Sequence, residues 1–454
     1  MDSKIRSWFH RTLSVKTEAL WVFVGQTGNA VGILLGMKIL TQFLNPFEFG
    51  RLSIANTVVL LVSVSLFGPL GNGFMRFWSI SHDRGQVEDF FRTANRYAGW
   101  LLIFVLAVTS IFFLFCSFSG RIKQADLITL SLIVGALRGY FGLRLAVFLG
   151  ARKRKIVALI NAGTAIFKPM CATLLVIVFV SNADVAMWGY FITTLVVLLM
   201  VERYYKNFIK DDLVPLSSVR TPNVDPHGIG KEILAFSWPF CTWGIFVWIH
   251  QSCDRWSLLA FHGADVVGAF SVVALLAAYP LIFASGFLLN LFMPMAYEQA
   301  GDLNSYSDLK SAYKIILSMI VVYTMGAVAL ICIFVFFHET IVLLMSNAEY
   351  VRFSYLLPGL TLSWALFYLG ETFASFGFIA KKPKMYVLPK LISATIAAIG
   401  TFFLSSRIGV QGVVWAIGIS GFFYAAWCAV IASICYGGMS SLTENCQKME
   451  QTPS

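Results

Sequence analysis

The sequence predicts an all-α polytopic membrane protein with about twelve transmembrane helices in two six-helix lobes. Hydrophobic residues make up 58% of the chain and charged residues only 13%, whereas a soluble domain carries about 25% charged residues. Apolar runs long enough to cross a bilayer recur along the whole 454-residue chain. These runs do not alternate polar with apolar residues, which excludes the strands of a transmembrane barrel.

Twelve apolar segments are predicted to span the membrane. The first follows a basic stretch with Lys4, Arg6, Arg11 and Lys16, and it is too long for a signal-peptide core. We therefore expect it to be a retained helix. The predicted spans are 20–43, 50–75, 95–118, 126–149, 156–180, 185–205, 233–257, 266–293, 312–337, 352–379, 386–405 and 411–436.

The basic residues give the predicted orientation of the chain. The net charge is +11, and 23 of the 34 Lys and Arg residues lie in the N-terminus, the tail and every second connection, against five in the others. Because basic loops remain in the cytoplasm, both termini are expected to be cytoplasmic. These residues lie in short loops and not in a folded basic domain, so no nucleic-acid partner is expected.

The longest polar break divides the spans six and six. It contains Pro215, Pro222 and Pro226, as an inter-lobe linker would. The predicted organisation lists a cytoplasmic N-terminus at 1–19, the N-lobe at 20–205, the linker at 206–232, the C-lobe at 233–436 and a cytoplasmic tail at 437–454.

A weak internal repeat supports two equivalent lobes. Residues 40–55 align with 258–273 at an offset of 218, and the alignment pairs Gly50 with Gly268 and Ser53 with Ser271. An even number of spans in each half makes such a repeat parallel, with its axis along the membrane normal. The alternative is chance similarity between two apolar segments.

Ionisable residues inside the spans are candidates for function because they are costly to bury in a membrane. Arg138 in the fourth span and Lys168 in the fifth each lie about 18 Å from the helix end, near the middle of the bilayer. No carboxylate is predicted at that depth in the N-lobe. The pair therefore predicts a cationic cavity for a phosphate or an acidic sugar. The alternative is hydrogen bonding to backbone carbonyls and Asn161.

The seventh span carries a second group of ionisable residues. His250 and Asp254 are four residues apart and share a helix face. A His–carboxylate pair can carry coupling protons, so His250, Asp254 and Arg255 are candidate gating or coupling residues. The alternative for Asp254 and Arg255 is a structural ion pair near the outer interface.

Several function classes are disfavoured by what the sequence lacks. There is no C-x-x-C pair and no His/Cys cluster with metal-ligand spacing, so no metal or other cofactor is expected. There is no phosphate-binding loop for ATP hydrolysis. The longest predicted outer loop, at about 337–351, is too poor in acidic residues for a membrane glycosyltransferase or polymerase. The chain is therefore expected not to be an enzyme.

Three stretches carry a resemblance to a known family. They are LTQFLNPFEFGRLSIA at 40–55, GNGFMRF at 71–77, and the segment from SWPF to GAFSVV at 237–273. In these the chain resembles bacterial oligosaccharide and O-antigen flippases of the polysaccharide-transporter family. That family belongs to the multidrug/oligosaccharide-lipid/polysaccharide exporter superfamily.

The resemblance implies two lobes around a central cavity and an alternating-access transporter in the bacterial inner membrane. The implied substrate is an undecaprenyl-diphosphate-linked oligosaccharide, a precursor of lipopolysaccharide O-antigen or exopolysaccharide. The implied substrate-binding residues are Arg138 and Lys168, with Arg76 and Arg144 at the cytoplasmic mouth; Lys38, near the outer end of the first span, completes the predicted set. In the C-lobe the family pattern matches Asp254 and Arg255.

The expected partners are the lipid-linked oligosaccharide, the bilayer, and a polysaccharide polymerase with its chain-length machinery. Two alternatives remain within the superfamily. A multidrug or cation antiporter would need carboxylates facing the cavity, where the N-lobe offers cations. A peptidoglycan lipid-precursor flippase tends to have two more helices than the twelve predicted here.

Overall fold

The computed structural model describes residues 2–119, 122–213, 228–300, 306–380 and 382–437. Throughout these ranges the chain is helical and contains no strand. Twelve helices or helix runs are long and apolar enough to cross a membrane, which confirms the predicted fold class. The chain divides into two compact units, and each is described by itself: unit 1 comprises 1–252 with 264–268, and unit 2 comprises 253–263 with 269–454.

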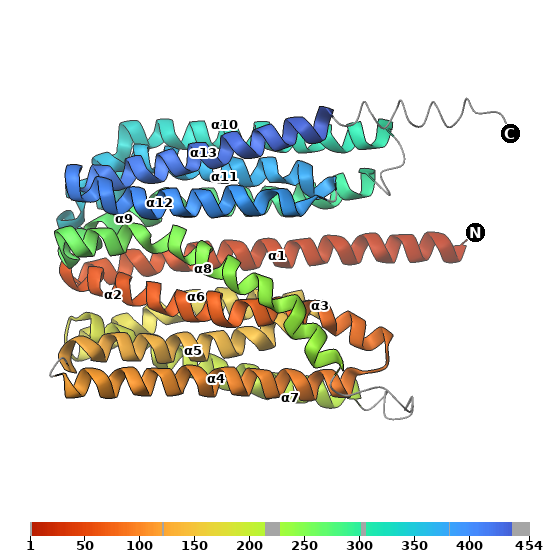
Figure 1. Ribbon diagram of the computed structural model, residues 1–454, viewed down its shortest axis with the longest axis horizontal. Coiled ribbons are helices and arrows are strands. Elements are labelled where there is room, and N and C mark those ends of the chain that lie inside the picture. Colours follow the sequence, from red (N-terminus) through yellow and green to blue (C-terminus); the bar gives the residue numbers. More distant parts are fainter. Residues whose placement is uncertain (1, 120–121, 214–227, 301–305, 381, 438–454) are drawn as a thin grey trace. The chain divides into compact units, whose positions relative to one another are not determined.

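Unit 1 is built from the first seven helices, most of helix α8 and the first turn of α9. Figure 1 shows α4 and α5 running alongside one another. The helices are α1 (Asp2–Phe43), α2 (Pro46–Leu60), α3 (Gly68–Asp83), α4 (Val87–Phe118), α5 (Ile122–Gly150), α6 (Arg154–Val178), α7 (Ala183–Leu213), α8 (Gly228–His262) and α9 (Ala264–Ala300).

Unit 2 contains the end of α8, the rest of α9 and, within the described residues, four further long helices. They are α10 (Tyr306–Met345), α11 (Leu357–Ile379), α12 (Val387–Ile408) and α13 (Val410–Gly437), with short 3₁₀ segments at Ala348–Leu356 and Pro383–Tyr386. In Figure 1 these four helices run alongside one another, and α13 packs against both α11 and α12. Small residues allow this packing, because a Cβ on Gly421 would overlap the Ser363 carbonyl and one on Gly412 the Leu404 carbonyl.

The helices extend beyond the predicted spans where they cover an aromatic core. The predicted linker 206–232 is shorter than expected, because α7 continues to Leu213 and α8 begins at Gly228; residues 214–227 lie outside the described part. Tyr205 and Phe208 explain the longer α7, because both are buried in the aromatic core of unit 1. That core also contains Phe74, Phe77, Trp78, Phe90, Phe91 and Phe148.

Helices α1 and α6 pack together through small residues. Four glycines of α1 lie at helical spacing on one face, and a Cβ on any of them would overlap α6. They are Gly25, Gly28, Gly32 and Gly36, which face Ala158, Ala162, Ala165 and Pro169 in turn. Small residues let two helix backbones approach closely, which is how helices associate within a bilayer. Lys168 lies beside this contact between α1 and α6, because it directly precedes Pro169 in the sequence.

The second predicted span is not one uniform α-helix. Between α2 and α3 the backbone forms a π-helical segment, η1, from Leu61 to Phe67. Nothing in the sequence predicted this segment. Gly139 of α5 makes room for the Phe67 ring on one side of η1, and Gly244 of α8 lies against the Ser65 backbone on another. The segment is therefore enclosed by close contacts at two glycines, one with a side chain and one with the backbone.

Within unit 1, α8 follows the run from α2 to α3 along most of its length. Arg84 pairs with Glu232 at 3.0 Å near the start of α8, and Ser237 packs on Gly73. Farther along, the Trp248 indole Nε1 donates to the Thr57 carbonyl at 2.7 Å. These contacts explain why residues 233–252, predicted to belong to the C-lobe, cluster with unit 1.

The first turns of α2 and α9 cross at two glycines. A Cβ on Gly50 would overlap the Ala264 carbonyl, and a Cβ on Gly268 would overlap the Pro46 carbonyl. Both pairs of equivalent residues, Pro46 with Ala264 and Gly50 with Gly268, are separated by the offset of 218 seen in the sequence repeat. The contact therefore has the reciprocal form expected of two equivalent segments.

Candidate functional site

Lys168 lies at the centre of a polar cluster inside unit 1. Its Nζ is 3.4 Å from the Asn56 Oδ1 and 3.9 Å from the centre of the Tyr190 ring. Asn56 also shares a side-chain hydrogen bond with Tyr190. Within the described residues, Lys168 thus contacts an amide and an aromatic ring. Neither of them carries a negative charge.

Arg138 of α5 is the second cation of this cluster. Its charge acts on that of Lys168, so the structure brings together the two residues that the sequence placed at the same depth. Arg138 is exposed and Lys168 is half-buried. Two like charges held close together repel in an apolar environment. An anion bound between them would relieve this repulsion.

Sequence reasoning missed Asn56 and Tyr190 and named Asn161 instead. Asn161 is exposed on α6, whereas Asn56 of α2 is the amide that accepts from Lys168. Asn56 was detectable as a polar residue inside an apolar run. Tyr190 carried no signal, because tyrosines occur throughout the spans and only helix rotation decides which one faces Lys168.

Arg144 is held by the protein's own side chains. Its Nε lies 2.6 Å from Glu202, and its terminal nitrogens donate to Asn95 and Tyr140, each at 2.7 Å. The guanidinium also stacks on Tyr205, 4.3 Å from the ring centre. Only 3% of Arg144 is exposed. These contacts join α4, α5 and α7, an arrangement suited to fixing helices.

The other predicted substrate residues lie apart from Lys168. Arg76 of α3 is exposed and stacks over Phe236 of α8 at 5.7 Å. Lys38 of α1 is half-buried. In the part of the chain that the structure describes, neither residue contacts Lys168. Their assignment to substrate binding stays a prediction.

The predicted gating residues fall at the division between the units. Asp254 is 2% exposed, and its Oδ1 accepts from the Arg255 backbone N–H at 2.7 Å and lies 3.5 Å from the Arg255 guanidinium. The predicted ion pair of adjacent residues is therefore present. His250 is buried in unit 1, whereas Asp254 belongs to unit 2. A coupling role for the three residues stays a prediction.

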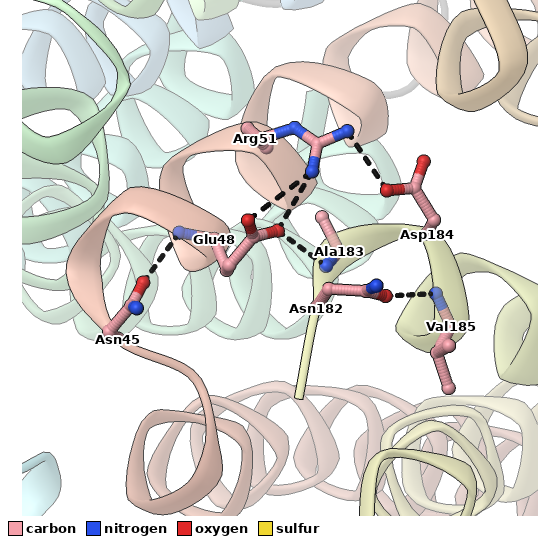
Figure 2. Close-up of polar contacts among 7 residues, drawn as sticks. All are labelled: Asn45, Glu48, Arg51, Asn182, Ala183, Asp184 and Val185. Carbon is pink, nitrogen blue, oxygen red and sulfur yellow. Dashed lines mark hydrogen bonds and ion pairs between the residues drawn. The ribbon is translucent and has the colours of Figure 1, made fainter. Parts of the chain in front are cut away.

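An ionic network joins the beginnings of α2 and α7 (Figure 2). Arg51 is 3.0 Å from Glu48 and 2.9 Å from Asp184. Glu48 also accepts from the Ala183 backbone N–H at 2.8 Å. Asn45 caps the start of α2 in the same region, and the Asn182 side chain accepts from the Val185 N–H. Helix N-termini favour nearby carboxylates, so the network fixes α2 against α7 two turns before Asn56.

Unit 2 contains its own half-buried polar cluster. Glu371 of α11 is 2.6 Å from Lys390 of α12 and accepts from the Tyr424 hydroxyl of α13 at 3.1 Å. Three helices therefore meet at one carboxylate. Together with Glu202 and Asp254, this means that three carboxylates within the candidate spans each have a cation at ion-pair distance.

Comparison with solved structures gives matches over almost the whole chain. The inward-closed lipid II flippase MurJ matches with a TM-score of 0.69 and 13% identity, over 96% of this chain and 93% of that one. An inward-facing multidrug resistance MATE family transporter of the MOP superfamily matches with a TM-score of 0.67 and 12% identity, over 91% and 96%.

A MOP superfamily transporter from Pyrococcus furiosus matches with a TM-score of 0.60 and 13% identity, over 93% of this chain and 96% of that one. No protein-family model and no curated protein matches the chain. Structural matches at such low sequence identity establish the fold but do not identify the substrate. The twelve candidate spans and these matches show that the chain has the fold of the MOP superfamily transporters.

Proposed function

We propose that this protein is a flippase of the polysaccharide-transporter family. It would move an undecaprenyl-diphosphate-linked oligosaccharide across the bacterial cytoplasmic membrane by alternating access, with both termini in the cytoplasm. The translocated glycan would then pass to a polysaccharide polymerase and its chain-length machinery. The fold supports a transporter, and the sequence resemblance supports this family.

The observation that carries the proposal is the polar cluster at Lys168, where the ammonium contacts Asn56 and Tyr190 and the charge of Arg138 acts on it. A lipid-linked diphosphate bears several negative charges. The guanidinium of Arg138 offers it a planar, bidentate set of donors, and the ammonium of Lys168 offers a compact positive charge. Among the described residues, Lys168 contacts the Asn56 amide and the Tyr190 ring, neither of which is negatively charged. A transported anion would supply the negative charge that these contacts lack.

The cation-antiporter alternative is less well supported. Such a carrier needs carboxylates that a substrate cation can reach, yet Glu202, Asp254 and Glu371 already have cationic partners. The match to a lipid II flippase favours the other alternative, a peptidoglycan-precursor flippase. Its substrate presents the same diphosphate chemistry, so substrate choice must be decided by experiment.

The test is translocation in proteoliposomes, with polyprenyl-diphosphate-linked oligosaccharide and lipid II as separate substrates. Arg138→Gln and Lys168→Gln should each lower oligosaccharide translocation at least tenfold at equal reconstitution. Arg407→Gln and Lys310→Gln are matched controls, since these cations belong to unit 2 and stack on Phe403 and Tyr306. Full activity in both site variants would refute the proposal, and transport of lipid II alone would favour the alternative.

A further inference from the structure

Trp248 contacts the backbone that carries the candidate anion site. Its indole Nε1 donates to the Thr57 carbonyl at 2.7 Å. Thr57 is 4% exposed and directly follows Asn56, the residue that accepts from Lys168. One turn of α2 therefore has two contacts: its backbone, at Thr57, is bonded to α8, and its side chain at Asn56 is bonded to Lys168.

The backbone at this turn is irregular, which gives the contact a specific role. The Leu61 N–H, at the start of η1, is shared between the Thr57 and Val58 carbonyls. A carbonyl oxygen can accept two hydrogen bonds. The Thr57 carbonyl accepts only a share of the Leu61 N–H, and the Trp248 indole gives this carbonyl a second hydrogen bond. This bond lies where the α-helix changes to a π-helix. Such π turns occur frequently at functional sites.

The packing around η1 leaves little freedom for independent movement. On the α5 side, Gly135 lies against the Val59 backbone, while Gly139 lies against the Phe67 ring. On the α8 side, Gly244 lies one helical turn from Trp248 and against the Ser65 backbone. Closely packed backbones transmit displacement instead of absorbing it. A shift of α8 would consequently reach Asn56.

We propose that Trp248 is a positioning residue of the anion site, acting through the Thr57 carbonyl and the π turn on Asn56. Asn56 in turn orients the Lys168 ammonium over Tyr190. An indole N–H without an acceptor is costly in an apolar interior, so the bond forms whenever α8 is seated on α2. Seating of α8 and anion binding at Lys168 must then affect each other reciprocally. This inference rests on the proposed function for the identity of the ligand.

The first test measures binding of farnesyl diphosphate to the full chain in detergent. Trp248→Phe keeps an aromatic ring and removes the indole N–H, and it should raise the Kd about fivefold, the effect of one typical net hydrogen bond. The matched control is Trp415→Phe, at a tryptophan of α13 that is 64% exposed. It should leave the Kd unchanged.

A double-mutant cycle separates positioning from general damage. If Trp248 acts through Asn56, Trp248→Phe should have no further effect on the Kd in an Asn56→Ala background. If the fold-changes in Kd of Trp248→Phe and Asn56→Ala multiply in the double variant, the two residues act independently and the proposal is overturned. A Trp248→Phe variant that binds as tightly as Trp415→Phe would also overturn it.

A ligand-independent measurement keeps the inference separate from the proposed function. Asn56→Cys, in a chain whose eight native cysteines are replaced by alanine, reports the accessibility of position 56. Trp248→Phe should change the rate of its alkylation by a small maleimide at least threefold, and Trp415→Phe should not. Equal rates would overturn the positioning role. Failure of the wild type to bind farnesyl diphosphate, with a changed alkylation rate, would instead count against the proposed ligand alone.

Discussion

The Nζ atom of Lys168 lies 3.9 Å from the centre of the Tyr190 ring. An aromatic face attracts a cation but carries no formal negative charge, so the ring holds the ammonium in place without forming an ion pair with it. Tyr190 is 7% exposed and reaches Asn56 with its hydroxyl. One side chain therefore orients both the cation and the amide of the candidate site.

We expect replacements of Tyr190 to separate these two contributions. Tyr190→Phe keeps the ring and loses the hydroxyl, whereas Tyr190→Leu also loses the cation–π contact, which contributes about 0.5–2 kcal/mol. Leu should therefore weaken farnesyl diphosphate binding several-fold more than Phe. Titration of both variants in detergent checks this order. Equal affinities would show that the ring face makes no contribution.

Arg144 should matter for stability more than for substrate binding. Arg144→Ala would leave the half-buried Glu202 without its cation. Breaking a fully buried pair costs about 3–5 kcal/mol, so this change should cost somewhat less. Arg92→Ala removes a pair with Glu88 in which both side chains are about two-thirds exposed, and it should cost under about 1 kcal/mol. Thermal unfolding in detergent measures both changes.

The double variant Arg144→Met/Glu202→Leu distinguishes these roles further. It replaces the ion pair with apolar side chains and should recover most of the lost stability. It should also keep farnesyl diphosphate affinity near the wild-type value. A folded double variant without affinity would return Arg144 to the substrate-binding set.

The seam between α1 and α6 should not tolerate larger residues. At Gly32 a Cβ would overlap the Ala165 backbone, so Gly32→Val should destabilise unit 1 by about 1–3 kcal/mol. Gly326→Val in α10 is the matched control, because a Cβ there meets nothing within 4 Å. The yield of monodisperse protein and its melting temperature report the difference. A Gly32→Val variant as stable as the control would mean that the helices pack less closely.

The Glu371–Lys390 pair should show direct coupling. Lys390→Met and Glu371→Gln each leave a partner inside unit 2, and a double-mutant cycle should give a coupling of about 0.5–3 kcal/mol in unfolding free energy. Tyr424 donates to the same carboxylate, so Tyr424→Phe should weaken this coupling. Additive effects of the two charge variants would contradict a shared cluster.

The fold was predictable because each membrane-spanning helix requires an apolar run long enough to cross the bilayer, and such runs are visible in the sequence. Depth counting also placed Arg138 and Lys168 at one level, and the structure brings them together. Contacts that depend on helix rotation were not predictable. Glu202 reaches Arg144 from 58 residues away, and Asn56, not Asn161, faces Lys168. The π turn at Leu61–Phe67 carried no recognisable sequence signal either.

The crossing of Gly50 and Gly268 is reciprocal, as in the contact between two copies of one chain. In a symmetric homodimer, a single substitution at such an isologous contact would alter both sides at once. Here the equivalent positions are encoded separately, so each side can be varied while the other stays constant. The two sides of this crossing are therefore free to diverge in sequence while the close contact between the two glycines is kept.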